Sequence, residues 1–312
     1  MRLRQFGTTS MKVSEVGFGS WAIGGQSYGA VNKAESLNAL ARAEELGCNF
    51  VDTALVYGES EVVLGEFLDG RRARWLIATK YSGQEGGLTA TVEQQLRNLR
   101  TDVIDFYQIH WMPRGKDEAL FDEMQKLKQA GKVRYTGVSL YNQKDIDDLI
   151  ARPEIDGFQV AFSLLDPDPF LARVRAVRAA RKGVIIRSSL REGFLTGKFK
   201  RDATFPDPND QRHKLTREEI AQLVDRVEKF RFLEAEAGSM AVAAARYPLS
   251  FPEVSTVILG TKNVAQADSN FGNVPGAGLS ADNLERIKSL QIELGLGERW
   301  PRLMRRFGLA GA

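Results

Sequence analysis

The chain contains few of the residues that build disulfide frameworks and metal centres. Among its 312 residues there is one cysteine, Cys48, and there are two histidines, His110 and His213. A single cysteine excludes an intrachain disulfide and a multi-cysteine zinc or iron–sulfur cluster, and two histidines exclude a three-histidine catalytic zinc site. We therefore expect chemistry that uses no metal ion.

Long hydrophobic runs are absent as well. No stretch approaches about 18 uncharged apolar residues, the length that a membrane-spanning helix needs, and the mean hydropathy is −0.28. The first twenty residues carry Arg2, Arg4, Lys12 and Glu15, and they lack the apolar segment of a secretory leader. These absences predict a cytoplasmic protein that does not contact the membrane.

A large excess of one charge is also missing. Forty-three Lys and Arg residues oppose 40 Asp and Glu residues, which leaves a net charge of +3. This is too small to indicate a nucleic-acid partner. Hydrophobic residues make up 43% and charged residues 27% of the chain, as in an ordinary globular protein. No linker or change of composition divides the sequence, so we expect residues 1–312 to form a single domain.

Short apolar runs alternate with amphipathic stretches along the chain. The runs are rich in Val, Ile and Phe and lack strict polar alternation, which is typical of strands buried on both faces. We predict strands at Val16–Gly19, Cys48–Thr53, Trp75–Thr79, Val103–His110, Lys132–Ser139, Gly157–Phe162, Gly183–Arg187 and Val254–Leu259. We predict helices at Lys33–Leu46, Glu61–Leu68, Thr89–Leu99, Lys116–Gln129, Gln143–Ile150 and Pro169–Lys182. Gly47, Gly131 and Gly183 follow three of these helices, where a left-handed C-cap is expected.

This alternation predicts an α/β fold with a parallel sheet, and its eight units fit a (β/α)₈ TIM barrel of roughly 250 residues plus insertions. The run Gly17–Ala22 matches the dinucleotide fingerprint of an open Rossmann sheet. That fingerprint must open a helix, yet the glycine-rich run 24–29 follows it, so we favour the barrel. Lys198–Phe232 is then a long loop after the seventh strand, and the tail beyond Leu290 covers the rim.

Four side chains suited to proton transfer follow three consecutive predicted strands. Asp52 and Tyr57 lie at or after the end of the second strand, Lys80 follows the third, and His110 ends the fourth. These strand ends meet at the rim where barrels hold their active sites. We expect Lys80, oriented by Asp52, to lower the pKa of Tyr57 and make it a proton donor. A neutral His110 would stabilise a developing alkoxide. None of these groups supplies a hydride, so reduction requires a nicotinamide cofactor.

With these residues in view, the sequence resembles the aldo-keto reductases, in particular the long-chain branch that includes the β-subunits of voltage-gated potassium channels. The run 52–66 reads Asp-Thr-Ala-x-x-Tyr-Gly-x-Ser-Glu-x-x-Leu-Gly-Glu and carries the most specific match. Further motifs match in order at 19–26, 193–198 and 260–270, and the resemblance runs from about residue 3 to 290. It implies a (β/α)₈ barrel with NADP(H) across the C-terminal rim.

The resemblance also implies which residues serve the reaction and the cofactor. The catalytic residues would be Asp52, Tyr57, Lys80 and His110. The cofactor would contact Ser20, Trp21, Gln26, Asp52, Ser139, Gln159, Arg187, Ser188, Leu190, Lys198, Gly260, Lys262, Gln266 and Asn270. Two positions depart from the family pattern: Leu140 replaces the usual Asn, and Arg187 replaces the aromatic residue that commonly stacks on the nicotinamide. A fixed cation there would disfavour the positively charged oxidised cofactor. Trp21 and Trp111 are candidates for lining a substrate pocket.

The leading functional hypothesis is an NADP(H)-dependent reduction of an aldehyde or ketone, reversible toward the alcohol. A cofactor-sensing regulatory subunit with slow chemistry is the alternative. A third hypothesis makes Lys80 the Schiff-base lysine of an aldolase. The expected ligand is a small carbonyl compound or alcohol, and the sequence specifies neither its identity nor the oligomeric state.

Overall fold

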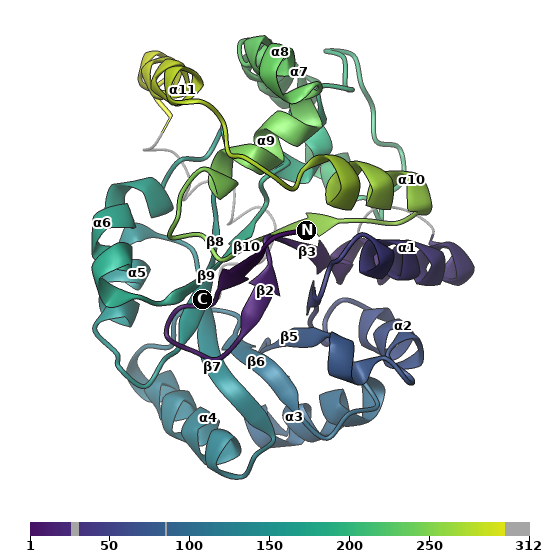
Figure 1. Ribbon diagram of the computed structural model, residues 1–312, viewed down its shortest axis with the longest axis vertical. Helices are drawn as coiled ribbons and strands as arrows, with labels where there is room; N and C mark the ends of the chain where they lie inside the picture. Colours follow the sequence, from purple (N-terminus) through teal and green to yellow (C-terminus); the bar gives the residue numbers. More distant parts are fainter. Residues whose placement is uncertain (26–30, 85, 297–312) are drawn as a thin grey trace.

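In the computed structural model, eight parallel strands close into a barrel with helices around it (Figure 1). The structure describes residues 1–25, 31–84 and 86–296. The predicted contact of Gln26 and the predicted position of the tail from residue 297 therefore lie outside the described residues. In barrel order the strands are β3 (Val16–Gly19), β4 (Phe50–Asp52), β5 (Leu76–Tyr81), β6 (Ile104–Ile109), β7 (Val133–Leu140), β8 (Gly157–Ala161), β9 (Gly183–Arg187) and β10 (Thr256–Gly260).

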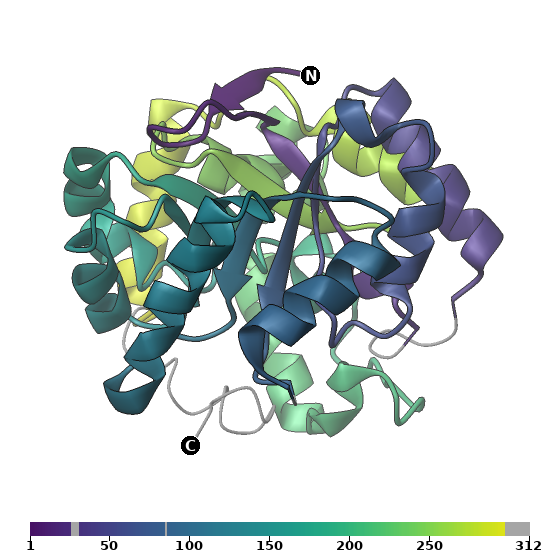
Figure 2. The same ribbon diagram turned by 90° about the horizontal axis from the view of Figure 1, so that it is seen from below.

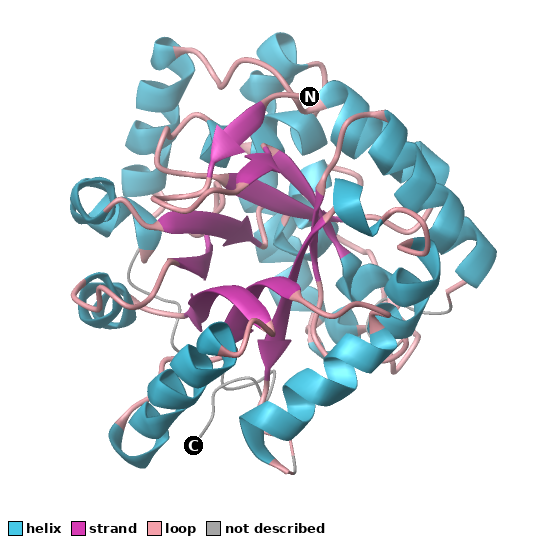
Figure 3. Ribbon diagram, turned by 60° about the horizontal axis from the view of Figure 1, so that its bottom comes forward, coloured by secondary structure: helices cyan, strands magenta, loops and turns pink. Residues whose placement is uncertain are grey.

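The helices form a ring outside the strands (Figure 3). They are α1 (Lys33–Glu45), α2 (Ser60–Phe67), α3 (Gly87–Asn98), α4 (Ala119–Gln129), α5 (Gln143–Ile150), α6 (Phe170–Ala180), α7 (Arg217–Glu228), α8 (Glu234–Ala237), α9 (Met240–Leu249), α10 (Val264–Ala267) and α11 (Ala281–Glu293). The main hydrophobic core lies between this ring and the outer faces of the strands. Within the described part of the chain, no helix has the length and apolar character needed to cross a membrane.

The predicted barrel is confirmed. All eight predicted strands are present with ends shifted by a few residues, and each strand pairs in parallel with its neighbours. The run Gly17–Ala22 ends β3 and enters a short 3₁₀ turn, Ser20–Ile23, which confirms our rejection of the Rossmann alternative. The predicted helices correspond to α1–α6.

Two local predictions are corrected by the structure. The segment Lys198–Phe232 is not only a loop, because it contains α7, which begins with a capping box between Thr216 and Glu219 and buries Ile220 on its apolar face. Gly183 is not a C-cap: Arg181 takes the left-handed conformation at the end of α6. Gly183 instead begins β9, where an added Cβ would lie 2.2 Å from the Phe6 ring.

An N-terminal hairpin closes one end of the barrel. Its strands β1 (Leu3–Gln5) and β2 (Lys12–Ser14) pair antiparallel, and Figure 2 shows them at the end opposite the segment around α7. Between them Phe6 is fully buried and packs edge-on against Phe106 of β6, with ring centroids 4.9 Å apart. Within the described residues, this apolar plug fills the N-terminal end of the barrel, so we expect a ligand to enter from the C-terminal rim.

Candidate active site

A buried ion pair lies at the base of the C-terminal mouth. Asp52 ends β4 and Lys80 lies near the end of β5, so adjacent strands bring the two side chains together. Lys80 Nζ lies 2.5 Å from Asp52 Oδ1 and also donates to the Thr53 carbonyl oxygen at 2.8 Å. The two side chains are 0% and 2% exposed. Burial lowers the pKa of Lys80, while the carboxylate of Asp52 opposes that shift.

Two glutamine amides hold the second oxygen of Asp52. Gln159 Nε2 donates to Oδ2 at 2.8 Å, and Gln108 Nε2 donates to it at 3.2 Å. Gln108 pairs with Lys80 in the register of β5 and β6. A buried carboxylate with three donors is fixed in position and compensated in charge. Sequence reasoning missed Gln108, although it lies two residues before His110 in the strand predicted at Val103–His110, a spacing that places both on one face.

Tyr57 lies above this pair. Its ring centroid is 5.0 Å from Lys80 Nζ, and its ring stacks on that of Trp21 with centroids 5.8 Å apart. The backbone beneath is tightly packed: a Cβ added at Gly24 would lie 1.7 Å from the Tyr57 carbonyl oxygen. Only glycine at position 24 permits this approach, so Gly24 helps to position the tyrosine.

The pKa of Tyr57 shifts in the direction opposite to our expectation. Loss of hydration in the mouth and the charge of Asp52 raise its pKa well above 10, and only Arg187 acts to lower it. Loss of hydration is the largest of these effects, and it outweighs the lowering that we expected from a neighbouring ammonium group. The phenol therefore stays protonated at neutral pH, which is the form that a proton donor needs.

His110 completes the predicted set of four residues. Its ring lies edge-on to that of Tyr57, with centroids 6.2 Å apart and planes at 71°. Burial and the charges of Lys80 and Arg187 hold its pKa well below 6.5, so the neutral imidazole that we expected is present. The Ser82 hydroxyl lies 2.8 Å from Nδ1. In the tautomer in which Ser82 donates this bond, Nε2 carries the proton and can donate to a ligand.

Next to this set lies a polar group suited to a nicotinamide carboxamide. Ser139 of β7 pairs in register with Gln159 of β8. The Ser139 hydroxyl is buried, and within the described residues it has no hydrogen-bond partner. A buried hydroxyl without a partner is costly unless a ligand satisfies it. The residues present therefore fit the carboxamide end of the cofactor.

The loop after β9 has a backbone conformation that non-glycine residues rarely adopt. Ser188, Arg191 and Glu192 all adopt positive φ values, between 47° and 58°. Such strain in non-glycine residues often marks a functional loop, and successive N–H groups in this conformation can form a concave anion site. Leu190 lies within the loop, and the buried Ser189 hydroxyl has no partner among the described residues. This loop fits the pyrophosphate of a dinucleotide.

Three cations from separate segments gather beside this loop. Burial and the charge of Arg212 lower the pKa values of both Lys198 and Lys262, and Lys198 also acts on Lys262. Arg212 was missed by sequence reasoning because it lies in the segment predicted as a loop. Asp210 holds its guanidinium at 2.9 Å and 2.6 Å, and the group lies 4.4 Å from the centroid of the Phe205 ring. Such a cluster fits a phosphate.

Other predicted cofactor residues have bonds within the protein. The buried Ser20 hydroxyl donates to the Asp52 carbonyl oxygen at 2.8 Å, which gives this side chain a structural role. After Gly260, Gln266 accepts from the Lys262 backbone at 2.8 Å and Asn270 donates to Thr261 at 2.9 Å. These bonds shape the loop that presents Lys262. Trp111, which with Trp21 was predicted to line a substrate pocket, packs on Tyr81 with ring centroids 5.8 Å apart.

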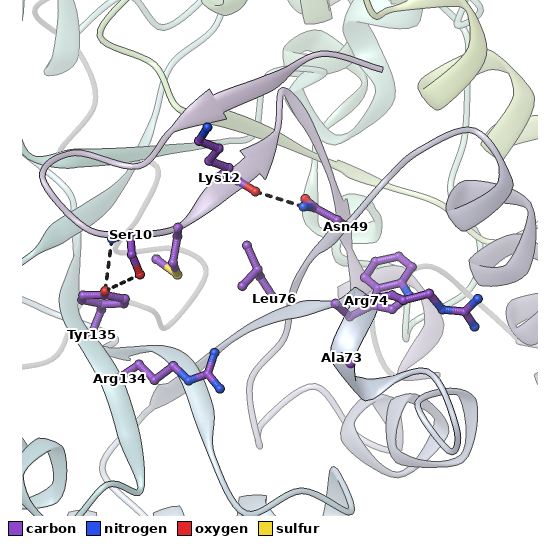
Figure 4. A pocket seen from close by; sticks show the side chains of 10 residues that line it. Ser10, Lys12, Asn49, Ala73, Arg74, Leu76, Arg134 and Tyr135 are labelled. Atoms are coloured by element: carbon purple, nitrogen blue, oxygen red, sulfur yellow. Dashed lines mark hydrogen bonds between the residues drawn. The ribbon is translucent and has the colours of Figure 1, made fainter.

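Two cavities lie at the opposite end of the barrel. One of about 250 Å³ is lined by Ser10, Met11, Lys12, Asn49, Ala73, Arg74, Trp75, Leu76, Arg134 and Tyr135. Figure 4 shows that the charged ends of Lys12, Arg74 and Arg134 do not point toward one another. The other is lined in part by Gln5, Gly7 and Lys182. Both lie beside the N-terminal plug, so neither belongs to the site around Tyr57.

Comparison with known proteins agrees with this geometry. A sequence profile of the aldo/keto reductase family matches residues 15–292. The oxidoreductase YqkF of Bacillus subtilis is 30% identical over 310 residues, which cover 93% of this chain and 96% of that protein. The NADH-specific methylglyoxal reductase of Escherichia coli is 25% identical, with 82% of this chain and 84% of that protein covered.

A solved structure extends the agreement to the fold. The glycerol dehydrogenase AKR11B4 from Gluconobacter oxydans superimposes with a TM-score of 0.79 at 26% identity, covering 93% of this chain and 95% of that one. None of these matches singles out the branch of the channel β-subunits, so that finer assignment stays a prediction. The family profile, the closed barrel and the similar proteins together establish that this chain belongs to the aldo-keto reductase family of oxidoreductases.

Proposed function

We propose that this protein reduces an aldehyde or ketone to the alcohol, with NADP(H) as hydride source and Tyr57 as proton donor. The observation that carries the proposal is the position of Tyr57 above the buried Lys80–Asp52 pair, with His110 beside it. A protonated phenol and a neutral imidazole in a poorly hydrated mouth are suited to an oxygen atom that gains negative charge.

The roles of the side chains follow from their protonation states. When bound, the reduced nicotinamide supplies a hydride to the carbonyl carbon. His110 donates a hydrogen bond to the carbonyl oxygen, and Tyr57 transfers its proton to that oxygen as charge develops. An alkoxide is a stronger base than a phenolate, so this transfer is favourable even with a raised pKa at Tyr57. Alcohol oxidation requires the phenolate, so we expect the reverse reaction to be slow at neutral pH.

The cation cluster supports the phosphorylated cofactor. Lys198 and Lys262 are repelled by each other and by Arg212, whose charge Asp210 compensates in part, and a dianionic phosphate would relieve the remaining repulsion. NADP(H) carries one phosphate more than NAD(H), on the adenosine ribose. The pyrophosphate alone would occupy the loop after β9, which leaves the cluster for the additional phosphate.

Titration of the protein with NADPH and NADH, followed by fluorescence, tests the cofactor assignment. We expect Lys262→Met to weaken NADPH binding by about tenfold, the order of one charge-assisted hydrogen bond, and to change NADH binding little. Lys229→Met, which removes an exposed lysine paired with Glu293 at 3.0 Å, is the matched control. Equal affinities for NADPH and NADH in the unaltered protein would contradict the NADP(H) assignment.

A panel of aldehydes and ketones with the bound cofactor tests the reaction. Oxidation of NADPH by one or more of them supports the reductase. Tight cofactor binding without turnover, together with a co-purifying protein, would instead favour a regulatory subunit. The Schiff-base hypothesis has little support, since Lys80 Nζ is enclosed and donates to Asp52 and Thr53. A covalent adduct on Lys80 after borohydride treatment would revive it.

A further inference from the structure

Arg187 stands apart from the other cations of the mouth. It ends β9, opposite Ala161 of β8, one strand beyond Gln159. Its guanidinium lies 4.6 Å from the centroid of the Tyr141 ring, and Nη2 donates to the Leu140 carbonyl oxygen at 3.2 Å. These contacts hold the group in place without neutralising it. Within the described residues, no carboxylate forms an ion pair with it at 4.0 Å or less.

The neighbouring charged groups make their close contacts with one another. Lys80 is compensated by Asp52 at 2.5 Å. Arg191 lies 3.3 Å from Asp166 and 3.4 Å from Glu192. Asp166 and Glu192 both make their close contacts with Arg191, so two carboxylates share one guanidinium, and both also feel the charge of Arg187 at longer range. Because no carboxylate among the described residues contacts Arg187, its charge still acts on the groups in the mouth.

That charge reaches the place where hydride transfer must occur. The field of Arg187 acts on Tyr57, Lys80 and His110, and in each case it opposes added positive charge or favours negative charge. A carbonyl oxygen bonded to Tyr57 lies about 3 Å from the phenol oxygen. The hydride donor must approach the carbonyl carbon to about 3–3.5 Å. The nicotinamide ring is therefore confined to the region in which Arg187 acts.

Oxidation of the cofactor changes the charge in this region. The reduced nicotinamide ring is neutral and the oxidised ring carries one positive charge, while the rest of the dinucleotide is unchanged. A fixed guanidinium repels only the oxidised ring. We propose that Arg187 sets the redox preference of the cofactor site, so that the reduced dinucleotide binds more tightly and the oxidised one is released readily after turnover. This inference rests on the proposed function.

Two variants at one position separate charge from packing. Arg187→Met removes the charge and keeps an unbranched side chain, whereas Arg187→Lys keeps the charge and loses the planar stacking on Tyr141. The dissociation constants of NADP⁺ and NADPH are measured for each variant at one ionic strength, by quenching of tryptophan fluorescence. Arg178→Met on α6 is the control, since that arginine is exposed beside the N-terminal plug.

We expect the ratio of the NADP⁺ dissociation constant to the NADPH dissociation constant to fall about tenfold in Arg187→Met. An effect of this size is expected from one partly screened charge near the nicotinamide ring. The ratio should stay within about threefold of the wild-type value in Arg187→Lys and Arg178→Met. A merely structural role would weaken both ligands together and leave the ratio unchanged. If Arg187→Met fails to fold, Arg187→Gln replaces it.

An unchanged ratio in the neutral variant, or an equal fall in the lysine variant, would overturn the assignment. NAD⁺ and NADH provide a second pair of ligands, because the charge difference lies on the same ring. If no dinucleotide binds the wild-type protein, the proposed function fails along with this inference. If the dinucleotides bind and the ratio of their dissociation constants does not change when Arg187 is replaced, the proposed function stands and the role of Arg187 is refuted.

Discussion

Removal of Lys80 should have a large effect on stability, because it would leave a charged carboxylate inside the barrel. The two partners are 0% and 2% exposed and lie 2.5 Å apart. Breaking a buried pair by removing one partner costs about 3–5 kcal/mol. Asp52 would keep its bonds from Gln108 and Gln159, so we expect Lys80→Met to lower the free energy of unfolding by about 3 kcal/mol.

A second variant shows whether the buried charge is the cause. In Asp52→Asn/Lys80→Met the carboxylate is gone, and the new amide can still bond to the two glutamines. We expect this double variant to be about 1–2 kcal/mol more stable than Lys80→Met, because the unpaired charge has been removed. Both variants should be inactive, so the double variant should recover stability without recovering activity.

Equilibrium urea unfolding, followed by circular dichroism, measures these differences. Lys33→Met is the control: it breaks an ion pair with Glu66 at similar distance, but the lysine is 54% exposed, and such pairs contribute about 0–1 kcal/mol. A cost below about 1 kcal/mol for Lys80→Met would refute the reasoning. So would a double variant less stable than Lys80→Met.

Three further predictions concern the chemistry. Because the pKa of His110 lies well below 6.5 and that of Tyr57 well above 10, kcat/KM for carbonyl reduction should be flat from about pH 6.5 to 10. A midpoint inside that range would contradict the assigned protonation states. Ser82→Ala should lower kcat about tenfold with unchanged cofactor affinity, because Nδ1 of His110 loses the partner that orients it; Ser82→Thr should retain activity, and equal rates in Ser82→Ala and wild type would exclude the role. Gly24→Ala should lower kcat about 100-fold by displacing the Tyr57 backbone. In its control, Gly272→Ala, the added Cβ would lie 4.0 Å from the Leu46 side chain, an ordinary van der Waals contact. This variant should behave as wild type.

The sequence was sufficient to predict the barrel and the members of the central site. Strand ends in a parallel barrel meet at one rim, so assigning Asp52, Lys80 and His110 to strand ends amounted to placing them together. The same reasoning does not find Gln108 or Ser82. Their roles depend on register and on side-chain direction, and neutral polar residues are common in strands and loops.

Other features depend on long-range packing that no local pattern reports. The plug around Phe6 uses strands of three residues, too short for a periodic signal. Arg212 is brought to Lys262 by the fold of the segment before α7. The pKa of Tyr57 was predicted in the wrong direction because its sign depends on a balance between hydration and paired charges. The neighbouring residues alone do not determine that balance.

Isotope transfer from the cofactor and loss of the Tyr57 hydroxyl can be measured in one experiment on hydride and proton transfer. NADPH deuterated at nicotinamide C4 is incubated with the protein and with a carbonyl compound that the panel has identified, and Tyr57→Phe is compared with wild type. We expect deuterium on the carbinol carbon of the alcohol. We also expect Tyr57→Phe to reduce the carbonyl compound more slowly than wild type by about 100-fold or more, with unchanged NADPH affinity. Deuterium absent from that carbon, or near-normal reduction by Tyr57→Phe, would contradict the proposed function.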